Sequence, residues 1–464
     1  MQSKPSRTTF RDRLEEMVHS LRTEIVTGKW QGGDFLPSIQ QLGKQYALSI
    51  NSVQKGLDQL VAESLIERLP RIGIRIKERT EHAVITITIG YYPSLDSDAE
   101  FASLIKQFQI KYPHIHVQTI PLQYENYYET TSYYLNNEIV DVLAINQINF
   151  QQYVEQNHDL GEIFEPVFAA DCIYPYLPSL FQQSNQLYAQ PFIFSPVILC
   201  YNKKQLQEQQ MPEPSHDWTW AQFMVFIHEL ERKDPTKLAF YFYPATNNRW
   251  PIFLLQSGIN FQNDKSERAD FSDSAVIDSI QTCYDLIHRH NLFSNLLMSE
   301  NDINVEQLFA EQKVSIMMTT YFNLNKMQHI DFPFDIAPLP YVHTPRTLLL
   351  SIGFAANRKS KQKEAAKAFI SFMASYEVML HVRQRTYSIP AHMQAAEWEG
   401  EERAYRPQQF ELYRQISHTF ASLSDLHLKQ DESKQLLNIM NRYWMGIEEK
   451  ETLIARLKND LGVY

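Results

Sequence analysis

Glycine is scarce in this sequence, which limits the kinds of site the chain can build. Only 13 of the 464 residues are glycine, under half of the usual share of about 7%. Neither G-x-G-x-x-G nor G-x-x-x-x-G-K-[ST] occurs. We therefore expect no phosphate cradle built on a glycine-rich loop, and no cofactor.

Cysteine is scarce as well. Cys172, Cys200 and Cys283 are odd in number and far apart, and their spacing fits neither a disulfide framework nor a zinc site. We expect all three to be reduced and buried. The H-E-x-x-H and G-x-S-x-G motifs are also missing, so we predict neither a metal site nor catalytic residues.

Long apolar runs are missing too. No stretch of about 18 uninterrupted apolar residues occurs that could span a bilayer. Residues 1–16 hold Lys4, Arg7, Arg11 and Arg13 but lack the apolar segment of a secretory signal. We therefore expect a soluble, cytoplasmic protein that does not act at a membrane.

Charge is distributed unevenly along the chain. Residues 1–79 hold 13 Lys and Arg against 9 Asp and Glu, a net charge of +4, whereas the other 385 residues hold 30 against 45, a net charge of −15. The formal total of −11 thus combines a basic first segment with an acidic remainder. This asymmetry suggests that the first segment alone meets a polyanion.

Apolar periodicity over residues 10–77 predicts three helices and a two-stranded wing. Apolar residues recur at helical spacing in three segments, the second after Ser38 and the third after Ser49, and both serines can cap a helix. Residues 65–68 and 74–77 alternate as two short strands should. For the third helix, the predicted inward residues are Val53, Leu57, Leu60 and Val61, and the outward ones are Asn51, Ser52, Gln54, Lys55 and Asp58. Two short helices joined by a tight turn are typical of a helix-turn-helix, whose second helix enters the major groove of DNA.

These residues resemble the GntR family of bacterial regulators. The resemblance is carried by Gly33-Asp34-x-Leu36-Pro37-Ser38, by Leu48-Ser49-x-Asn51-Ser52-Val53, and by Leu57-x-x-Leu60 before Leu65-Ile66. It implies a winged helix-turn-helix DNA-binding domain, which we place at residues 1–79, and double-stranded operator DNA as its partner. The residues predicted to contact DNA are Gln40, Lys44, Asn51, Ser52, Gln54, Lys55, Arg71 and Arg75.

The sequence departs from this family at three places. Family members usually carry arginine where this chain has Gln40, Ile50 and Gln54. Glutamine can pair with an adenine edge but neutralises no phosphate, so we expect a lower affinity for DNA. A domain that folds but binds DNA weakly or not at all, and that serves dimerisation or docking, therefore stays open as an alternative.

The rest of the chain alternates strand and helix patterns. β-branched residues alternate over 84–89, an apolar helical stripe covers 101–108, and strands are indicated at 115–120 and 139–145. This order predicts a parallel β-α-β unit. Further helices are predicted at 219–233, 274–290, 303–312, 361–378 and 431–458, with a strand at 314–318. An α/β architecture of about 300 residues is too large for one core, so we expect two lobes.

This part of the chain resembles family 1 extracellular solute-binding proteins of ABC transporters. The motifs follow in the family's order: Asp141-Val142, Leu187-Tyr188-Ala189-x-Pro191-Phe192, Tyr201-Asn202-Lys203, Trp218-Thr219-Trp220, Asp335-Ile336-Ala337-Pro338-Leu339-Pro340 and Ile389-Pro390-Ala391. The resemblance implies a two-lobed α/β domain, like a type II periplasmic-binding protein, over residues 80–464. Such a fold binds sugars or oligosaccharides between hinged lobes. Joined to a DNA-binding domain, it would sense a solute inside the cell.

A sugar site needs aromatic platforms beside polar groups, and an open α/β sheet meets its ligand at loops that follow strand ends. The predicted ligand-binding residues are Tyr91, Tyr92, Asn146, Tyr201, Trp250, Tyr321 and Phe322. A place in the packed core or hinge is the alternative for each aromatic. Asp96 and Asp98 either accept hydrogen bonds from a sugar or are solvated loop carboxylates.

Together these features predict a ligand-responsive, one-component transcriptional regulator and not an enzyme. Closure of the lobes on a small solute of carbohydrate type would change the spacing of two DNA-binding domains in a homodimer. A cytoplasmic solute-binding module without DNA activity is one alternative. A carbohydrate-active enzyme is another, and it rests only on the expected class of ligand.

Overall fold

The structure is a computed structural model of the chain. It describes residues 10–26, 29–63, 65–69, 72–77, 84–124, 126–168, 172–244, 246–258, 273–289, 305–400 and 406–460. Contacts divide the chain into two compact units, residues 1–85 with 109–116 and residues 86–108 with 117–464. We call residues 10–77 the head and residues 84–460 the body; the domain bounds 1–79 and 80–464 stay predictions.

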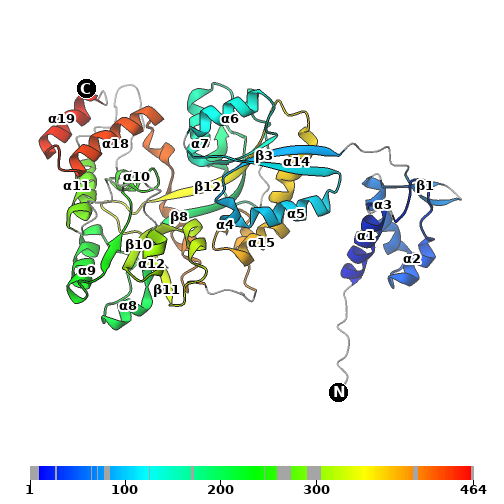
Figure 1. The fold of residues 1–464 in the computed structure, drawn as a ribbon, viewed down its shortest axis with the longest axis horizontal. Coiled ribbons are helices and arrows are strands. Elements are labelled where there is room, and N and C mark those ends of the chain that lie inside the picture. The colour runs from blue at the N-terminus through cyan, green and yellow to red at the C-terminus, as the bar shows by residue number, and fades with distance from the viewer. Residues whose placement is uncertain are drawn as a thin grey trace, which may run out of the picture. The chain divides into compact units, whose positions relative to one another are not determined.

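The head is a helical domain with a β-hairpin (Figure 1). Helices α1, α2 and α3 span Phe10–Val26, Ile39–Gln45 and Ile50–Ala62, and the antiparallel strands β1 and β2 span Ile66–Leu69 and Gly73–Ile76. All five elements contribute to one apolar core, which includes Met17, Leu42, Leu57, Ile66 and Ile76. The predicted winged helix-turn-helix is confirmed.

Two orientations predicted for α3 are wrong. Ser52, predicted to face outward, is only 5% exposed, because its hydroxyl lies 2.6 Å from that of the capping Ser49 and it sits one turn before Gly56, at the side of the helix that packs on α1. Val61, predicted to face inward, is 37% exposed at the far end of the helix. Both residues lie at the edge of the buried face of α3. At such an edge, helical periodicity does not separate buried from exposed side chains.

Ten strands of the described body form one mixed sheet. Its main path runs β4-β3-β5-β12-β8-β10-β9, with β11 and β13 also paired to β8 and β14 paired to β12. The strands are β3 Ile85–Tyr91, β4 Ile115–Pro121, β5 Val142–Asn146, β8 Gln190–Asn202, β9 Leu238–Tyr241, β10 Val314–Thr320, β11 Phe334–Ala337, β12 Thr347–Ala356, β13 Ile389–Pro390 and β14 Phe420–Ala421. A short hairpin, β6 Gln182–Gln183 with β7 Gln186–Leu187, lies apart from this sheet.

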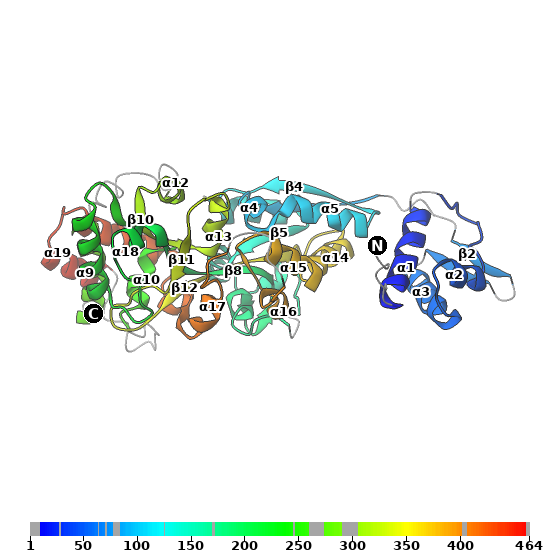
Figure 2. The same ribbon diagram turned by 90° about the horizontal axis from the view of Figure 1, so that it is seen from below.

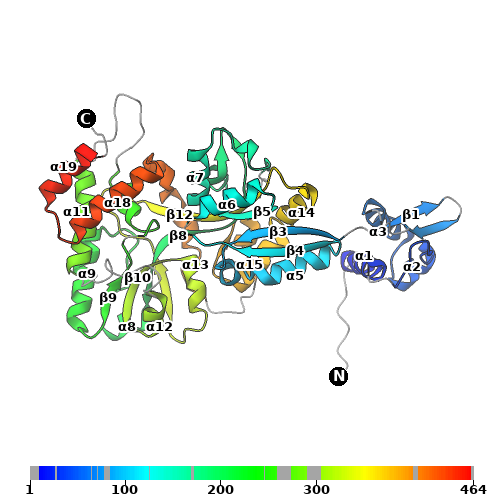
Figure 3. The ribbon, with the colours of Figure 1, turned by 45° about the horizontal axis from the view of Figure 1, so that its top comes forward.

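Strand β8 joins the two lobes of the body. Its first half, up to Pro196, pairs with β12, and its second half, from Val197, pairs with β10 and β11. At the junction the Ser195 hydroxyl accepts a hydrogen bond of 2.8 Å from the backbone N–H of Tyr321. One lobe therefore holds β3, β4, β5 and the adjoining part of β12, the other holds β9, β10 and β11, and a continuous strand connects them (Figures 1 and 3).

Helices cover both lobes, as Figure 2 shows from below. Those of the first lobe are α4 Leu95–Ala99, α5 Phe101–Lys111, α6 Tyr127–Asn136, α7 Gln147–Gln156, α14 Lys363–Met373, α15 Tyr376–Arg385 and α16 Met393–Ala396. Those of the second are α8 Lys203–Glu208, α9 Trp220–Lys233, α10 Trp250–Leu255, α11 Ser274–Arg289, α12 Val305–Ala310, α18 Gln430–Trp444 and α19 Lys450–Asp460. Two short helices, α13 Tyr321–Leu324 and α17 Leu412–Gln415, and the 3-10 turns η1 Leu160–Glu162, η2 Pro178–Phe181, η5 Asn325–Met327, η6 Ser417–Thr419 and η7 Leu423–Leu426 complete the body.

The predicted α/β architecture is confirmed, with two differences in the helices. The predicted helix at 431–458 is two helices, since the chain turns at Gly446 with a φ of +68°. The predicted helix at 361–378 is also broken, because Ser375 begins a second helix. Cys200 and Cys283 are buried as expected, whereas Cys172 is partly exposed; all three are free thiols.

Candidate functional sites in the head and the body

Five of the eight predicted DNA-contacting residues are exposed on the helix-turn-helix. Gln40 and Lys44 lie on α2, and Asn51, Gln54 and Lys55 lie on α3. Both helices therefore offer polar side chains to a partner without rearrangement. That these side chains contact DNA stays a prediction.

The other three predicted DNA contacts are placed differently. Ser52 is buried against Ser49. Arg75 of the wing is partly buried, and its Nε donates a hydrogen bond of 2.8 Å to Glu67 on the neighbouring strand, so this guanidinium is already engaged. Arg71 lies outside the described residues.

Local chemistry fixes the turn between α2 and α3. The side chains of Ser38 and Ser49 accept hydrogen bonds from the first turns of the two helices, as predicted. Between the helices Ala47 adopts a φ of +51°. A Cβ on Gly43 would lie 2.9 Å from the carbonyl oxygen of Leu48, so the close approach of the turn to α2 requires glycine there.

In the body, Tyr91, Tyr92 and Asn146 lie close together where β3 and β5 end. The hydroxyl of Tyr92 accepts hydrogen bonds from the backbone N–H of Asn146 at 3.2 Å and from the amide of Asn149 at 2.7 Å, and its ring stacks on Tyr124. Tyr92 is fully buried, and burial raises its pKa above the ordinary value. Tyr91 and Asn146 are partly exposed. The hydrogen bonds of Tyr92 therefore hold together the ends of β3 and β5, where Tyr91 and Asn146 lie.

Tyr201 is part of a polar cluster in the second lobe. It is 2% exposed at the end of β8, and its hydroxyl donates a hydrogen bond of 2.7 Å to Glu213. Lys203 lies 3.0 Å from the same carboxylate and 3.3 Å from the buried Asp335. Burial and the bond to Glu213 raise the pKa of Tyr201. Its ring is therefore packed within the lobe in this conformation.

The remaining predicted ligand-binding residues are divided between core and surface. Trp250 begins α10 and is 2% exposed. Tyr321 is fully buried and donates a hydrogen bond of 2.8 Å to the carbonyl oxygen of Phe410. Phe322 is partly exposed. The structure thus brings Tyr91, Tyr92 and Asn146 together but leaves the other residues apart, and a ligand-binding role for all seven stays a prediction.

Asp98 is not a solvated loop carboxylate, although Asp96 on the same helix is exposed. Asp98 is 6% exposed, and burial raises its pKa to about 7. Hydrogen bonds from Ser94, Ser97 and Asn325, together with the charge of Lys326, oppose that shift. Asn325 belongs to η5, which follows β10 and α13, so Asp98 joins α4 of the first lobe to a segment that continues from the second.

Sequence reasoning did not single out Asn325 or Lys326. Neither belongs to a motif, and both lie far along the chain from Asp98. The side-chain Oδ1 of Asn325 also accepts a hydrogen bond of 2.7 Å from the backbone N–H of Tyr387, and its Nδ2 donates one of 3.0 Å to the hydroxyl of Ser388. This buried asparagine therefore connects three segments of the body.

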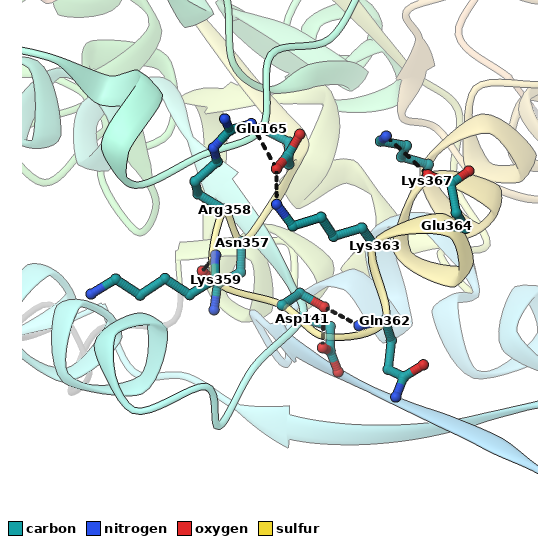
Figure 4. A network of polar contacts seen from close by, with 10 residues as sticks. Asp141, Glu165, Asn357, Arg358, Lys359, Gln362, Lys363, Glu364 and Lys367 are labelled. Atoms are coloured by element: carbon teal, nitrogen blue, oxygen red, sulfur yellow. Dashed lines mark hydrogen bonds and ion pairs between the residues drawn. The ribbon is translucent and has the colours of Figure 1, made fainter.

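A second polar network belongs to the first lobe and is shown in Figure 4. Glu165 accepts hydrogen bonds of 2.9 Å from Arg358 and 2.6 Å from Lys363. Burial opposes the ionisation of Glu165, but these two cations outweigh it and hold its pKa below the ordinary value. Nearby, Asp141 accepts a hydrogen bond from the backbone N–H of Thr88 at 2.8 Å and ties β5 to β3. We interpret this network as structural.

The described residues show neither a metal-binding cluster nor a membrane span. No three His, Cys, Asp or Glu side chains in the described ranges are grouped so as to hold a metal ion. Among the helices that the structure describes, none combines the length and the apolar character that a bilayer span needs.

Comparison with solved structures identifies the fold of the body. The ABC substrate-binding protein of Listeria monocytogenes in complex with cycloalternan has a TM-score of 0.68 at 16% identity, over 82% of this chain and 98% of that one. The maltose-bound MalE3 of T. maritima has a TM-score of 0.68 at 15% identity, over 82% and 99%. UgpB of Mycobacterium tuberculosis in complex with glycerophosphocholine has a TM-score of 0.63 at 15% identity, over 81% and 98%. At these identities the likeness shows the fold alone.

Comparison with protein families identifies both parts of the chain. The family described as bacterial extracellular solute-binding protein matches residues 92–380, which is more than half of the chain. The gntR family of bacterial regulatory proteins matches residues 14–76. No match was found among curated proteins. The chain therefore belongs to the family of bacterial extracellular solute-binding proteins and carries, ahead of that fold, a winged helix-turn-helix of the gntR family.

Proposed function

We propose that the protein is a cytoplasmic, one-component transcriptional regulator whose head binds operator DNA and whose body binds a small solute between its two lobes. The observation that carries this proposal is the union, in one chain, of a gntR domain that exposes the polar side chains of α2 and α3 with a two-lobed solute-binding fold. Neither family is an enzyme family, and we propose no catalytic activity.

We propose a carbohydrate as the solute. Cycloalternan and maltose occupy two of the similar structures, and the body supplies aromatic and amide side chains suited to the faces and hydroxyls of a sugar. Tyr91, Asn146 and Phe322 are partly exposed, and we propose that they contact the sugar directly. We propose that four buried side chains hold these contacts in place by their packing: Tyr92, Tyr201, Trp250 and Tyr321.

Closure of the lobes is the proposed signal. Strand β8 crosses from one lobe to the other between Pro196 and Val197, so rotation about this strand changes the separation of the lobes. A ligand shifts the balance between open and closed forms only by its differential affinity for them. In a homodimer, two heads bind DNA together only when their spacing fits half-sites about 34 Å apart. Closure that changes this spacing would therefore change the affinity for the operator.

A gel-shift titration of the full-length protein tests this function. The DNA is the fragment upstream of the protein's own gene at low salt, with and without maltose and maltopentaose, and native mass spectrometry of the freshly purified protein identifies any solute that it carries. We expect the fragment to be retained and its retention to change with a bound sugar. Failure to retain any DNA fragment at low salt overturns the proposal.

A head that serves docking or dimerisation is the second candidate. Glutamine and isoleucine stand at Gln40, Ile50 and Gln54 where the family usually has arginine, and Phe35 and Ile72 are 47% and 70% exposed. Substitution of arginine at Gln40 and Gln54 distinguishes a head that binds DNA from a head that serves docking or dimerisation. If the native head has lost DNA binding, only the restored variant retains DNA; if both retain it equally, the substitutions are harmless and the docking role loses its support.

A further inference from the structure

Helix α3 begins with an apolar side chain that faces solvent. Ile50 is the first residue of the helix and is 52% exposed, whereas Val53 and Leu57 are fully buried. Gln54 follows one turn later on the same face, because residues four apart in a helix are neighbours. Asn51 and Gln54 are both exposed. One apolar and two amide side chains thus share the first half of the helix that a helix-turn-helix inserts into the major groove.

These side-chain types favour one kind of base pair. Asparagine and glutamine amides pair with N6 and N7 of adenine, and an apolar side chain packs on the C5-methyl group of thymine. Guanine is read by arginine or lysine. Helix α3 contains no arginine, and its one lysine, Lys55, lies about 140° around the helix from Ile50. The side of α3 that carries Ile50 and Gln54 therefore holds groups for adenine and thymine, whereas the exposed Lys55 follows Asn51 by one turn on the neighbouring side of the helix.

In the part of the wing that the structure describes, Arg68 of β1 reaches α3, and its Nη2 lies 2.7 Å from Asp58. The same nitrogen donates a hydrogen bond of 3.1 Å to the backbone carbonyl of Gln54. Because the helix itself engages this guanidinium, Arg68 fastens the wing to α3.

The surface is held on a rigid support. The Ser49 side chain caps the first turn of α3 by accepting a hydrogen bond from the backbone N–H of Ser52. A Cβ on Gly56 would lie 2.4 Å from the terminal methyl of Met17, so α3 and α1 pack at close range. Ile50 and Gln54 are therefore fixed relative to the core of the head.

We infer that α3 selects A·T base pairs, with Ile50 packed on a thymine methyl group and Gln54 hydrogen-bonded to an adenine edge. This inference rests on the proposed function, because it names the DNA that the head would bind. The exposed apolar side chain at the start of α3 then has a partner.

Selection from a library of random duplexes tests the inference on the full-length protein. Duplexes with about 20 random base pairs are captured at low salt and sequenced, since one half-site pair spans about two helical turns. We expect A·T pairs to be enriched at positions shared by the selected sequences. Shared positions dominated by G·C pairs overturn the inference while leaving the proposed function intact. Failure to capture any duplex overturns the proposed function instead.

Removal of single thymine methyl groups then tests whether Ile50 contacts one of them. Each thymine of the selected duplex is replaced by uracil, and affinity is measured by fluorescence anisotropy for the native protein, Ile50→Ala and the control Val61→Ala, an exposed residue about three turns further along α3. At one thymine we expect the native protein to lose about fourfold in affinity, the value of one buried methyl group. Ile50→Ala should bind the thymine and uracil duplexes equally, and Val61→Ala should behave like the native protein. Equal sensitivity of Ile50→Ala and the native protein to every uracil contradicts the assignment.

Discussion

The head and the body present their recognition chemistry in opposite ways. On the head, α2 and α3 expose amide and ammonium groups such as Gln54 and Lys55. In the body, Tyr92, Tyr201 and Tyr321 are buried, and the hydroxyl of each is hydrogen-bonded inside the protein. A rigid partner such as a DNA duplex can meet the head without rearrangement. The aromatic groups of the body, in contrast, are satisfied already, so they position other side chains or become available only when their packing changes.

The largest expected effect comes from breaking the core of the body. Trp220 is 1% exposed, packs on Phe253 and donates a hydrogen bond of 2.8 Å to Gln256. Trp220→Ala should lower the free energy of unfolding of the body by about 3–5 kcal/mol, because it leaves a cavity and removes a buried hydrogen bond. Urea unfolding measures this loss.

Trp218→Ala is the matched control, since Trp218 is only partly buried and contacts Phe223 and Phe226 at the same helix. We expect its cost to be less than half of that of Trp220→Ala. If the head and the body are energetically separate, both variants should keep the DNA affinity of the native protein below the unfolding transition. A parallel loss of DNA binding and body stability would show that the two regions fold as one.

The next effect concerns the buried carboxyl of Asp98. Its pKa is about 7 in the folded protein against an ordinary value of 3.8, so between these values the folded state holds a proton that the unfolded state has released. Stability therefore falls as the pH rises from about 4 to about 7 and is constant above, and the loss is about 4 kcal/mol. Asp98→Asn cannot ionise, so it should be more stable than the native protein at pH 8, by urea unfolding, and lack this pH dependence.

The control for this prediction is Asp96→Asn, an exposed carboxyl on the same short helix. Its pH profile of stability should follow that of the native protein. Native and Asp98→Asn profiles that run parallel from about pH 4 to 8 would show that Asp98 is ionised at little cost. The contrast between the exposed polar surface of the head and the satisfied, buried polar groups of the body would then fail at Asp98.

The contrast between the head and the body also explains how much of each region could be predicted from the sequence. In the head, helical periodicity and the caps Ser38 and Ser49 are local signals, and all five elements were expected within a few residues of where they lie. In the body, β8 is buried along its whole length, so its residues show no alternation between faces that would mark a strand. The environment of Asp98 was also hidden, because Asn325 reaches it only through the tertiary fold. Local patterns thus located the elements of the head, although they misplaced Ser52 and Val61 at the edge of the buried face of α3, and they failed in the body, where distant segments meet.

The smallest expected effect tests the exposed cations of the head. Lys44 and Lys55 are exposed on α2 and α3, where a lysine that neutralises a phosphate contributes a counterion-release term. Lys44→Ala and Lys55→Ala should each reduce DNA affinity about fivefold to tenfold and lower the slope of log K against log salt by about 1, equally for all sequences. Lys29→Ala is the control, because Lys29 is exposed after α1 and pairs with Glu24 at 2.6 Å. Anisotropy titrations over about 50–200 mM salt measure these slopes. An unchanged slope in the double variant Lys44→Ala/Lys55→Ala would remove both lysines from the DNA interface and leave the amides of α3 to carry recognition alone.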